Sequence, residues 1–132
     1  MTTTISFPGG KRVNAEIDGF VVATDQARED GGDGSAPPPF SYFLSSIGTC
    51  AGIYVLGFCQ ARGIPTDGIR LLQHSEFDAA SHRLTRVRIE VHLPAAFPEK
   101  YRAAVARAAD LCAVKKAILT PPEFEVRTVV DG

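Results

Sequence analysis

The chain has 132 residues, of which 45% are hydrophobic and 22% are charged, and its net charge is −1. This length suits one core, so we expect a single domain over residues 1–132. The 14 Lys and Arg residues are scattered among 15 acidic residues, which argues against a nucleic-acid partner.

The start of the chain, Met1 to Ile5, lacks the basic residues and the apolar run of a signal peptide. Three cysteines at wide spacings do not form the even-numbered framework of a secreted disulfide protein. We therefore expect the protein to be cytoplasmic, in a reducing compartment.

Three short strands are predicted at the N-terminus, over residues 2–7, 12–17 and 20–24. Apolar and polar side chains alternate along the second of them, and Asp18-Gly19 is the signal of a two-residue hairpin turn. Residues 28–36 are polar and glycine-rich, which predicts a flexible loop.

An uncharged stretch follows over residues 34–61, and it predicts one long helix over about residues 39–62. Prolines are tolerated where this helix begins, and Gly63 is a natural C-terminal stop. A helix this apolar must be buried nearly all round. Its length raises the question of a membrane span, but its prolines, glycines and hydroxyl groups favour a buried helix and no membrane partner.

A second strand pair is predicted over residues 68–78 and 83–94. Its second strand alternates between apolar residues and charged or His residues, which indicates a sheet with one packed face and one wet face. A helix over 97–111, a short helix over 113–119 and a strand over 124–130 complete the chain. Segregated strands and helices predict an α+β fold with antiparallel sheets.

The long helix carries two faces of different character. Small residues, which let two helices approach closely, recur on one face at Ser41, Ser45, Gly48, Thr49 and Gly52. Because one sheet and one helix can hardly cover such a helix, we expect a homodimer; the alternative is that this face meets only the chain's own second helix. The other face suits a pocket for an apolar ligand and carries Phe43, Ile47, Cys50, Tyr54 and Phe58.

The three cysteines have different surroundings in the sequence. Cys50 and Cys59 lie on opposite sides of the long helix, roughly 13 Å apart along its axis, too far for a disulfide, and Cys59 is expected to be packing. Cys112 opens the short helix and is followed by Lys115 and Lys116, a setting that favours thiolate. Spacing alone leaves open whether Cys50 and Cys112 react or merely pack. The three histidines lack metal-ligand spacing, so neither a metal nor another cofactor is expected.

The run from Ala36 to Cys50, followed later by Cys112-Ala113-Val114-Lys115-Lys116, resembles the OsmC/Ohr family. This family comprises the osmotically inducible protein C and the organic hydroperoxide resistance proteins. The resemblance covers nearly the whole chain. It implies an OsmC-like fold, with antiparallel sheets around a long central helix, in an intertwined homodimer with both active sites at the subunit interface.

The resemblance also implies thiol peroxidase chemistry. Cys50 would attack the O–O bond of an organic hydroperoxide and become a sulfenic acid. Cys112 would resolve it as a disulfide, which an external dithiol then reduces. An apolar hydroperoxide would be favoured by the substrate-binding side chains Phe40, Phe43, Ile47, Tyr54 and Phe58.

The chain departs from the family pattern at one position. Family peroxidases carry a Glu ten residues before the first Cys, and that Glu holds an Arg against the thiolate; here Phe40 takes its place. The family's N-terminal Arg would fall near Lys11 or Arg12, without its orienting partner. The sequence is therefore similar to a divergent OsmC-like branch. The alternatives are a non-peroxidase member that binds an apolar small molecule at the dimer interface, and a dimer whose thiols only pack.

Overall fold

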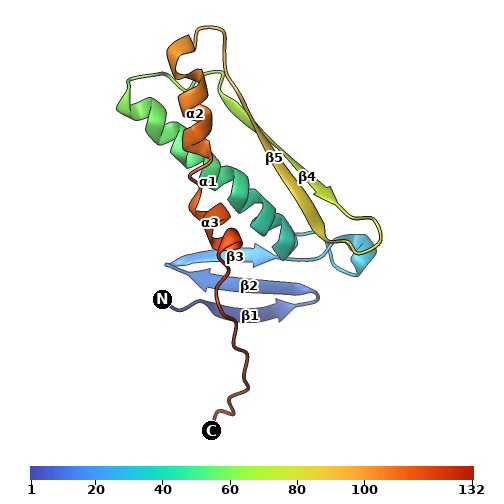
Figure 1. The fold of residues 1–132 in the computed structure, drawn as a ribbon. Helices are drawn as coiled ribbons and strands as arrows, with labels where there is room; N and C mark the ends of the chain where they lie inside the picture. Colours follow the sequence, from blue (N-terminus) through green and yellow to red (C-terminus); the bar gives the residue numbers. More distant parts are fainter. The chain divides into compact units, whose positions relative to one another are not determined.

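The computed structural model describes residues 1–132, which form two compact units, Met1–Ser46 and Ile47–Gly132. The single domain stays a prediction, whereas the mixed α+β class and the antiparallel sheets are confirmed. Figure 1 labels the strands and the α-helices. The elements are β1 (Thr4–Gly9), β2 (Arg12–Ile17), β3 (Phe20–Thr24), η1 (Arg28–Asp30), α1 (Pro39–Ala61), β4 (Arg70–Phe77), β5 (Leu84–His92), η2 (Glu99–Tyr101), α2 (Arg102–Ala109) and α3 (Ala113–Leu119).

The first unit contains a three-stranded antiparallel sheet in the order β1-β2-β3. Ile17 pairs with Phe20 across the predicted two-residue turn. Asp18 (φ +50°) and Gly19 (φ +81°) both lie in the left-handed region, which this kind of hairpin turn requires and which Asp and Gly tolerate. The three predicted strands and the turn are confirmed.

The loop after β3 is ordered around Asp25, so the prediction of a flexible loop is wrong. Asp25 has no exposed surface, and its carboxylate accepts four hydrogen bonds. The donors are the Gln26 N–H (2.7 Å), the Asp33 N–H (3.3 Å), and the Ser35 N–H (3.0 Å) and hydroxyl (2.6 Å). A buried carboxylate satisfied in this way ties both ends of the loop to one point.

Gly32 lies where this loop has no room for a side chain. A Cβ there would collide with the Gln26 carbonyl oxygen, and would lie 2.6 Å from its carbon and 2.8 Å from Asp25 Oδ1. We therefore expect Gly32→Ala to lower the melting temperature by several degrees in circular dichroism, because the obstacle is backbone. The control is Glu29→Ala at an exposed position of the same loop, which should leave the melting temperature unchanged. A Gly32→Ala protein as stable as the control would contradict the rigidity of this loop.

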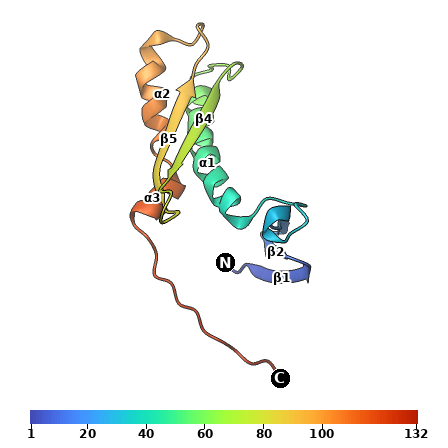
Figure 2. The same ribbon diagram turned by 90° about the vertical axis from the view of Figure 1, so that its right-hand side faces the viewer.

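The second unit packs α1 and α2 against one face of the β4–β5 hairpin, as both views show (Figures 1 and 2). The core contains six buried residues: Ala51, Val55 and Cys59 of α1, Phe97 of the loop before η2, and Val105 and Ala109 of α2. Leu71, Ile89 and Val91 of the sheet pack against this core. The alternation predicted for β5 therefore places its apolar residues against the helices.

The opposite face of the hairpin is polar, as predicted. Glu90 stands at its centre, and its carboxylate pairs with His74 (2.9 Å), His92 (3.0 Å) and Arg88 (3.5 Å). The hydrogen bond from His92 is the largest of the effects that hold the pKa of Glu90 below its ordinary value, and the charges of His74 and Arg88 add to it.

Helix α1 is buried along one stripe within the chain, so the expectation of burial nearly all round is wrong for a single copy. The buried residues are spaced four apart: Ile47, Ala51, Val55 and Cys59. Ile53, on another side, is 58% exposed. Gly48 of the small face packs against the chain's own β4, since a Cβ there would lie 2.5 Å from Gln73 Oε1. By length and composition α1 could cross a membrane, a test that core helices of soluble proteins also pass.

The strand predicted over residues 124–130 is absent: the residues after Leu119 have no regular structure and extend away from α3 (Figure 2). Phe124, Val126 and Val130 are 87%, 97% and 94% exposed. An alternating sequence becomes a strand only when its backbone groups find a neighbouring strand, and this segment has none within the chain.

Candidate active site

Cys50 and Cys112, which are far apart in the sequence, come together where α3 meets α1. Cys112 is 2% exposed and is the N-cap of α3, with its sulfur accepting a hydrogen bond from the Lys115 N–H (3.4 Å). Its sulfur lies 3.8 Å from the carbonyl oxygen of Ile47 on α1, one turn before Cys50. Cys112 therefore ties the start of α3 to the helix that carries Cys50.

The Cys50 thiol is partly exposed, and it is surrounded by hydrogen-bond donors. The backbone N–H of Val114, the thiol of Cys112 and the backbone N–H of Ala113 hold the pKa of Cys50 below its ordinary value, although burial opposes them. Backbone N–H groups at the start of a helix stabilise a thiolate because they are aimed at it and carry partial positive charge. The chemistry available to such a thiol is nucleophilic attack, with a second thiol beside it.

Lys115 and Lys116 were expected to supply positive charge here. The Lys115 ammonium instead pairs with the Asp110 carboxylate. The lowered pKa of Cys50 comes from backbone N–H groups at the start of α3, the helix start that the sequence associated with thiolate at Cys112, and from the neighbouring thiol. No group of three His, Cys, Asp or Glu side chains is arranged to hold a metal ion.

Cys59 lies apart from this pair in the core and has no exposed surface. Burial raises the pKa of its thiol, and the charge of Arg62 only partly offsets this. The prediction that Cys59 serves packing is confirmed.

The five predicted substrate-binding side chains lie in different settings. Phe40 and Phe43 are in the first unit, with ring centroids 5.2 Å apart and exposures of 49% and 37%. Ile47 is buried, and Tyr54 is partly exposed. Phe58 packs edge-on against Tyr101, with centroids 5.8 Å apart, so it belongs to a cluster at the other end of α1. The substrate role of these five residues stays a prediction.

Arg12, the predicted cation, lies on β2 in the first unit, where its guanidinium pairs with Asp33 at 3.0 Å. Arg12 therefore has a carboxylate partner although Phe40 stands at the family's Glu position. Sequence reasoning missed Asp33, because the loop that places it depends on Asp25. The role of Arg12 beside Cys50 stays a prediction.

A family model described as OsmC-like protein matches residues 32–127, a span that includes Cys50 and Cys112. The chain belongs to the OsmC-like family. No curated protein matches this family member.

Solved structures agree with the OsmC-like fold. A Psychrobacter arcticus protein named for osmotic stress induction and detoxification response is 19% identical, with a TM-score of 0.74 over 89% of this chain and 87% of that one. A Legionella pneumophila organic hydroperoxide resistance protein OsmC is 21% identical, with a TM-score of 0.58 over 89% of each chain. A Vibrio cholerae protein named for organic hydroperoxide resistance, with captopril in one of its active sites, is 19% identical, with a TM-score of 0.59 over 89% of this chain and 84% of that one. The family and the fold class are both confirmed.

The thiol of Cys50 is expected to react at lower pH than a free cysteine, whose pKa is about 8.5. The measurement is the rate of alkylation by iodoacetamide as a function of pH, with the modified residue identified by mass spectrometry. Ala113→Pro removes one backbone donor at the first helical position, where proline is tolerated, and should raise the pKa of Cys50. Cys59 is the internal control, because it should stay unmodified until the protein unfolds. If Cys50 has the same pH profile in the wild type and in Ala113→Pro, the Ala113 N–H does not lower the pKa of Cys50.

Proposed function

We propose that this OsmC-like protein reduces organic hydroperoxides through Cys50 and Cys112. The observation that carries the proposal is the proximity of the two thiols at the start of α3, with the pKa of Cys50 lowered by the Val114 N–H and by the Cys112 side chain. Membership of the OsmC-like family, and neighbours in fold that are named for organic hydroperoxide resistance, support the same role in the response to peroxides.

The proposed cycle has three steps. The Cys50 thiolate attacks the terminal oxygen of the hydroperoxide, the O–O bond breaks, and the products are a Cys50 sulfenic acid and an alkoxide that takes up a proton. The Cys112 sulfur then attacks the sulfenic sulfur, which forms a disulfide and releases water. An external dithiol reduces the disulfide by exchange and is itself oxidised. Because the Cys112 side chain lies close enough to Cys50 to lower its pKa, the second step needs little movement and protects the sulfenic acid from further oxidation.

The proposed active form is an intertwined homodimer in the cytoplasm. Within one copy, Ile53 on α1 and the alternating apolar residues of segment 124–130 are exposed. A second copy would bury α1 and offer an edge strand to the C-terminal segment. Light scattering should therefore give a dimer, and truncation after Pro122 should shift it toward monomer; a truncated chain that remains fully dimeric would remove this segment from the interface.

The test of the proposed function is turnover of cumene hydroperoxide in the presence of dihydrolipoamide as the dithiol. One cumyl alcohol should form for each dithiol oxidised, and mass spectrometry of the enzyme without reductant should find a Cys50–Cys112 disulfide. If the hydroperoxide leaves both thiols reduced, the proposal is wrong.

Phe40 favours a second candidate function, the binding of an apolar small molecule without peroxide chemistry. Its ring stands where family peroxidases carry Glu, and with Phe43 it presents partly exposed apolar surface. In that case an apolar fluorescent probe should bind the wild type and Cys50→Ser equally well, and hydroperoxide should leave Cys50 reduced. If neither the probe nor the hydroperoxide acts, the thiols only pack.

A further inference from the structure

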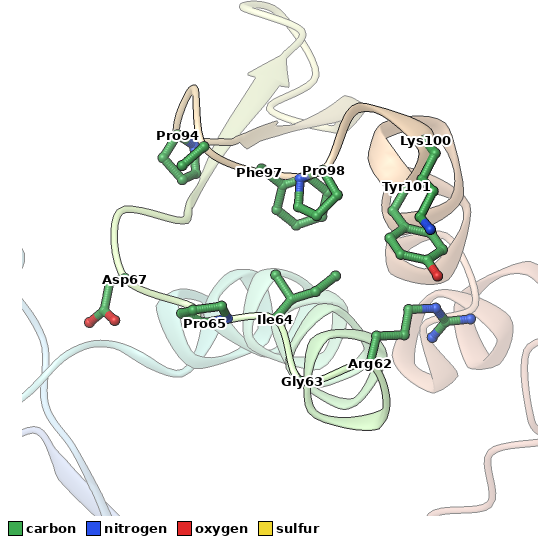
Figure 3. A pocket seen from close by; sticks show the side chains of 11 residues that line it. Arg62, Gly63, Ile64, Pro65, Asp67, Pro94, Phe97, Pro98, Lys100 and Tyr101 are labelled. Atoms are coloured by element: carbon green, nitrogen blue, oxygen red, sulfur yellow. The ribbon is translucent and has the colours of Figure 1, made fainter.

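A cavity of about 670 Å³ lies at the C-terminal end of α1, away from the cysteine pair (Figure 3). Its walls come from the turn and loop after α1, from the loop between β5 and η2, and from Tyr101. Small-molecule sites in proteins span about 300–1,000 Å³, so the cavity has the size of such a site. Arg62 follows Cys50 by twelve positions, roughly 18 Å along a helix, so the cavity is separate from the proposed active site.

The walls of this cavity are fixed by the backbone. Gly63 (φ +64°) ends α1 with a left-handed turn, after which the Ile64 N–H donates to the Cys59 carbonyl (2.9 Å). Gly68 (φ +78°) packs closely on Pro94, since a Cβ there would lie 3.4 Å from the proline ring. Phe97 is only 3% exposed, and its N–H closes a turn onto the Pro94 carbonyl (3.0 Å). The cavity is therefore preformed, which lowers the entropy cost of binding.

One end of the cavity is positively charged. The Arg62 guanidinium carbon lies 5.4 Å from the centroid of the Tyr101 ring, and the Lys100 ammonium lies 5.0 Å from the same centroid. Arg62 is held in place because it also stacks on Phe58 at 3.6 Å and donates to the Phe58 carbonyl (3.1 Å). Figure 3 shows the Tyr101 hydroxyl at this end, and Asp67 at the far end.

The C-terminus of α1 does not cancel the positive charge at this end of the cavity. The last carbonyls of a helix carry partial negative charge. Here the carbonyl of Cys59 accepts from the N–H groups of Arg62 (3.1 Å) and Ile64 (2.9 Å), and Phe58 accepts from the Arg62 side chain. Arg62 and Lys100 form none of the salt bridges of the chain. Both line the cavity, and the one acidic side chain among its lining residues is Asp67.

The middle of the cavity is apolar. Ile64 and Pro65 form one side, and Phe97 and Pro98 face them from the other (Figure 3). We propose that this cavity binds an organic carboxylate, with its charged group at Arg62, Lys100 and the Tyr101 hydroxyl and its hydrocarbon body between Ile64, Pro65, Phe97 and Pro98. This site is distinct from Cys50 and adds a ligand class that the proposed peroxide chemistry does not require.

Isothermal titration calorimetry with octanoate, compared with octylammonium of the same chain length, tests the proposal on the full chain. Octanoate should bind about tenfold more tightly than octylammonium, and its affinity should fall as salt is added, because the charges at the cavity mouth are screened. Equal or tighter binding of octylammonium would overturn the proposal, since Asp67 or simple hydrophobicity would then govern the site.

Substitutions at the positive end of the cavity test whether octanoate binds there. Lys100→Gln, at an exposed position, should lower the affinity for octanoate about tenfold. Arg107→Gln, at an exposed position of α2, should leave this affinity unchanged. Arg62→Gln should lower the affinity for octanoate by a similar factor, and Arg62→Lys should restore part of it. The comparison of these two variants separates the loss of charge from the loss of stacking on Phe58. Unchanged affinity in both Lys100→Gln and Arg62→Gln would place the ligand elsewhere. Lys100→Gln should keep full hydroperoxide turnover, so this test and that of the proposed function can fail independently.

Discussion

Replacing Cys50 with serine is expected to lower the turnover of organic hydroperoxides by at least about 100-fold, because loss of a catalytic nucleophile removes the reaction path. The serine hydroxyl does not ionise near neutral pH, so the donors at the start of α3 have no anion to stabilise. Stopped-flow measurement with cumene hydroperoxide and a dithiol gives the rate. Turnover that persists in Cys50→Ser would end the proposed mechanism.

Cys112→Ser should fail at a different step. Its Cys50 should still reduce about one equivalent of hydroperoxide in a single turnover, after which the sulfenic acid has no partner. Dimedone, which reacts with sulfenic acids, should label Cys50 in this variant, and excess hydroperoxide should drive Cys50 on to sulfinic acid. Cys59→Ala is the matched control, because Cys59 lies in the core and should not affect the chemistry. If Cys112→Ser cycles as fast as the wild type, another thiol resolves the intermediate.

Local sequence signals predicted the elements that local interactions determine. Asp18-Gly19 predicted a turn that needs two residues with positive φ, and both have it. The short helix predicted over residues 113–119 begins and ends at the predicted residues, and Cys112 caps it. The resemblance to the family singled out Cys50 and Cys112, whose side chains lie close enough for Cys112 to lower the pKa of Cys50. The catalytic role of the two residues stays a prediction.

Features that depend on distant partners were missed. The loop around Asp25 looked flexible, because nothing local shows that a carboxylate after β3 will be buried and then satisfied by Ser35. The segment over residues 124–130 has the alternation of a strand, but a strand also needs a neighbour, which one copy of the chain does not provide. The partner of Arg12 was sought ten residues before Cys50, whereas the fold supplies Asp33 from the ordered loop.

Replacing Asp25 with asparagine is expected to lower the free energy of unfolding near neutral pH and to weaken its dependence on pH below 4. The Ser35 hydroxyl, followed by the N–H groups of Ser35 and Gln26, lowers the pKa of Asp25 from 3.8 to about 2, although burial opposes them. Asparagine keeps the shape of the side chain but loses its charge. Its NH₂ group is a donor and would face the N–H and hydroxyl donors that surround the native carboxylate, so it would find no acceptor there.

The direction of the pH effect follows from the depressed pKa. Between pH 4 and pH 2 the unfolded chain binds a proton at Asp25 that the folded chain does not, so stability falls as the pH falls through this window. Urea unfolding followed by circular dichroism at several pH values should show this decline in the wild type and in Asp30→Asn, an exposed control in the same loop. Asp25→Asn should be less stable at pH 7 and should lose less stability between pH 4 and pH 2 than the wild type, with the remaining decline due to Glu90 and Asp78, whose pKa values are also lowered. An unchanged pH profile in Asp25→Asn would assign the acid sensitivity to other carboxylates.

The same substitution connects the stability of the loop with the proposed chemistry. The Asp33 N–H donates to the Asp25 carboxylate, while the Asp33 side chain pairs with Arg12. Weakening the hydrogen bonds of residue 25 should therefore weaken the ion pair between Asp33 and Arg12 as well as destabilise the first unit. If Arg12 serves the Cys50 thiolate in the active dimer, Asp33→Asn should lower the rate of hydroperoxide reduction with little change in unfolding, whereas Asp25→Asn should lower both. If Asp33→Asn retains the full rate, the pair with Asp33 is structural and another cation assists Cys50.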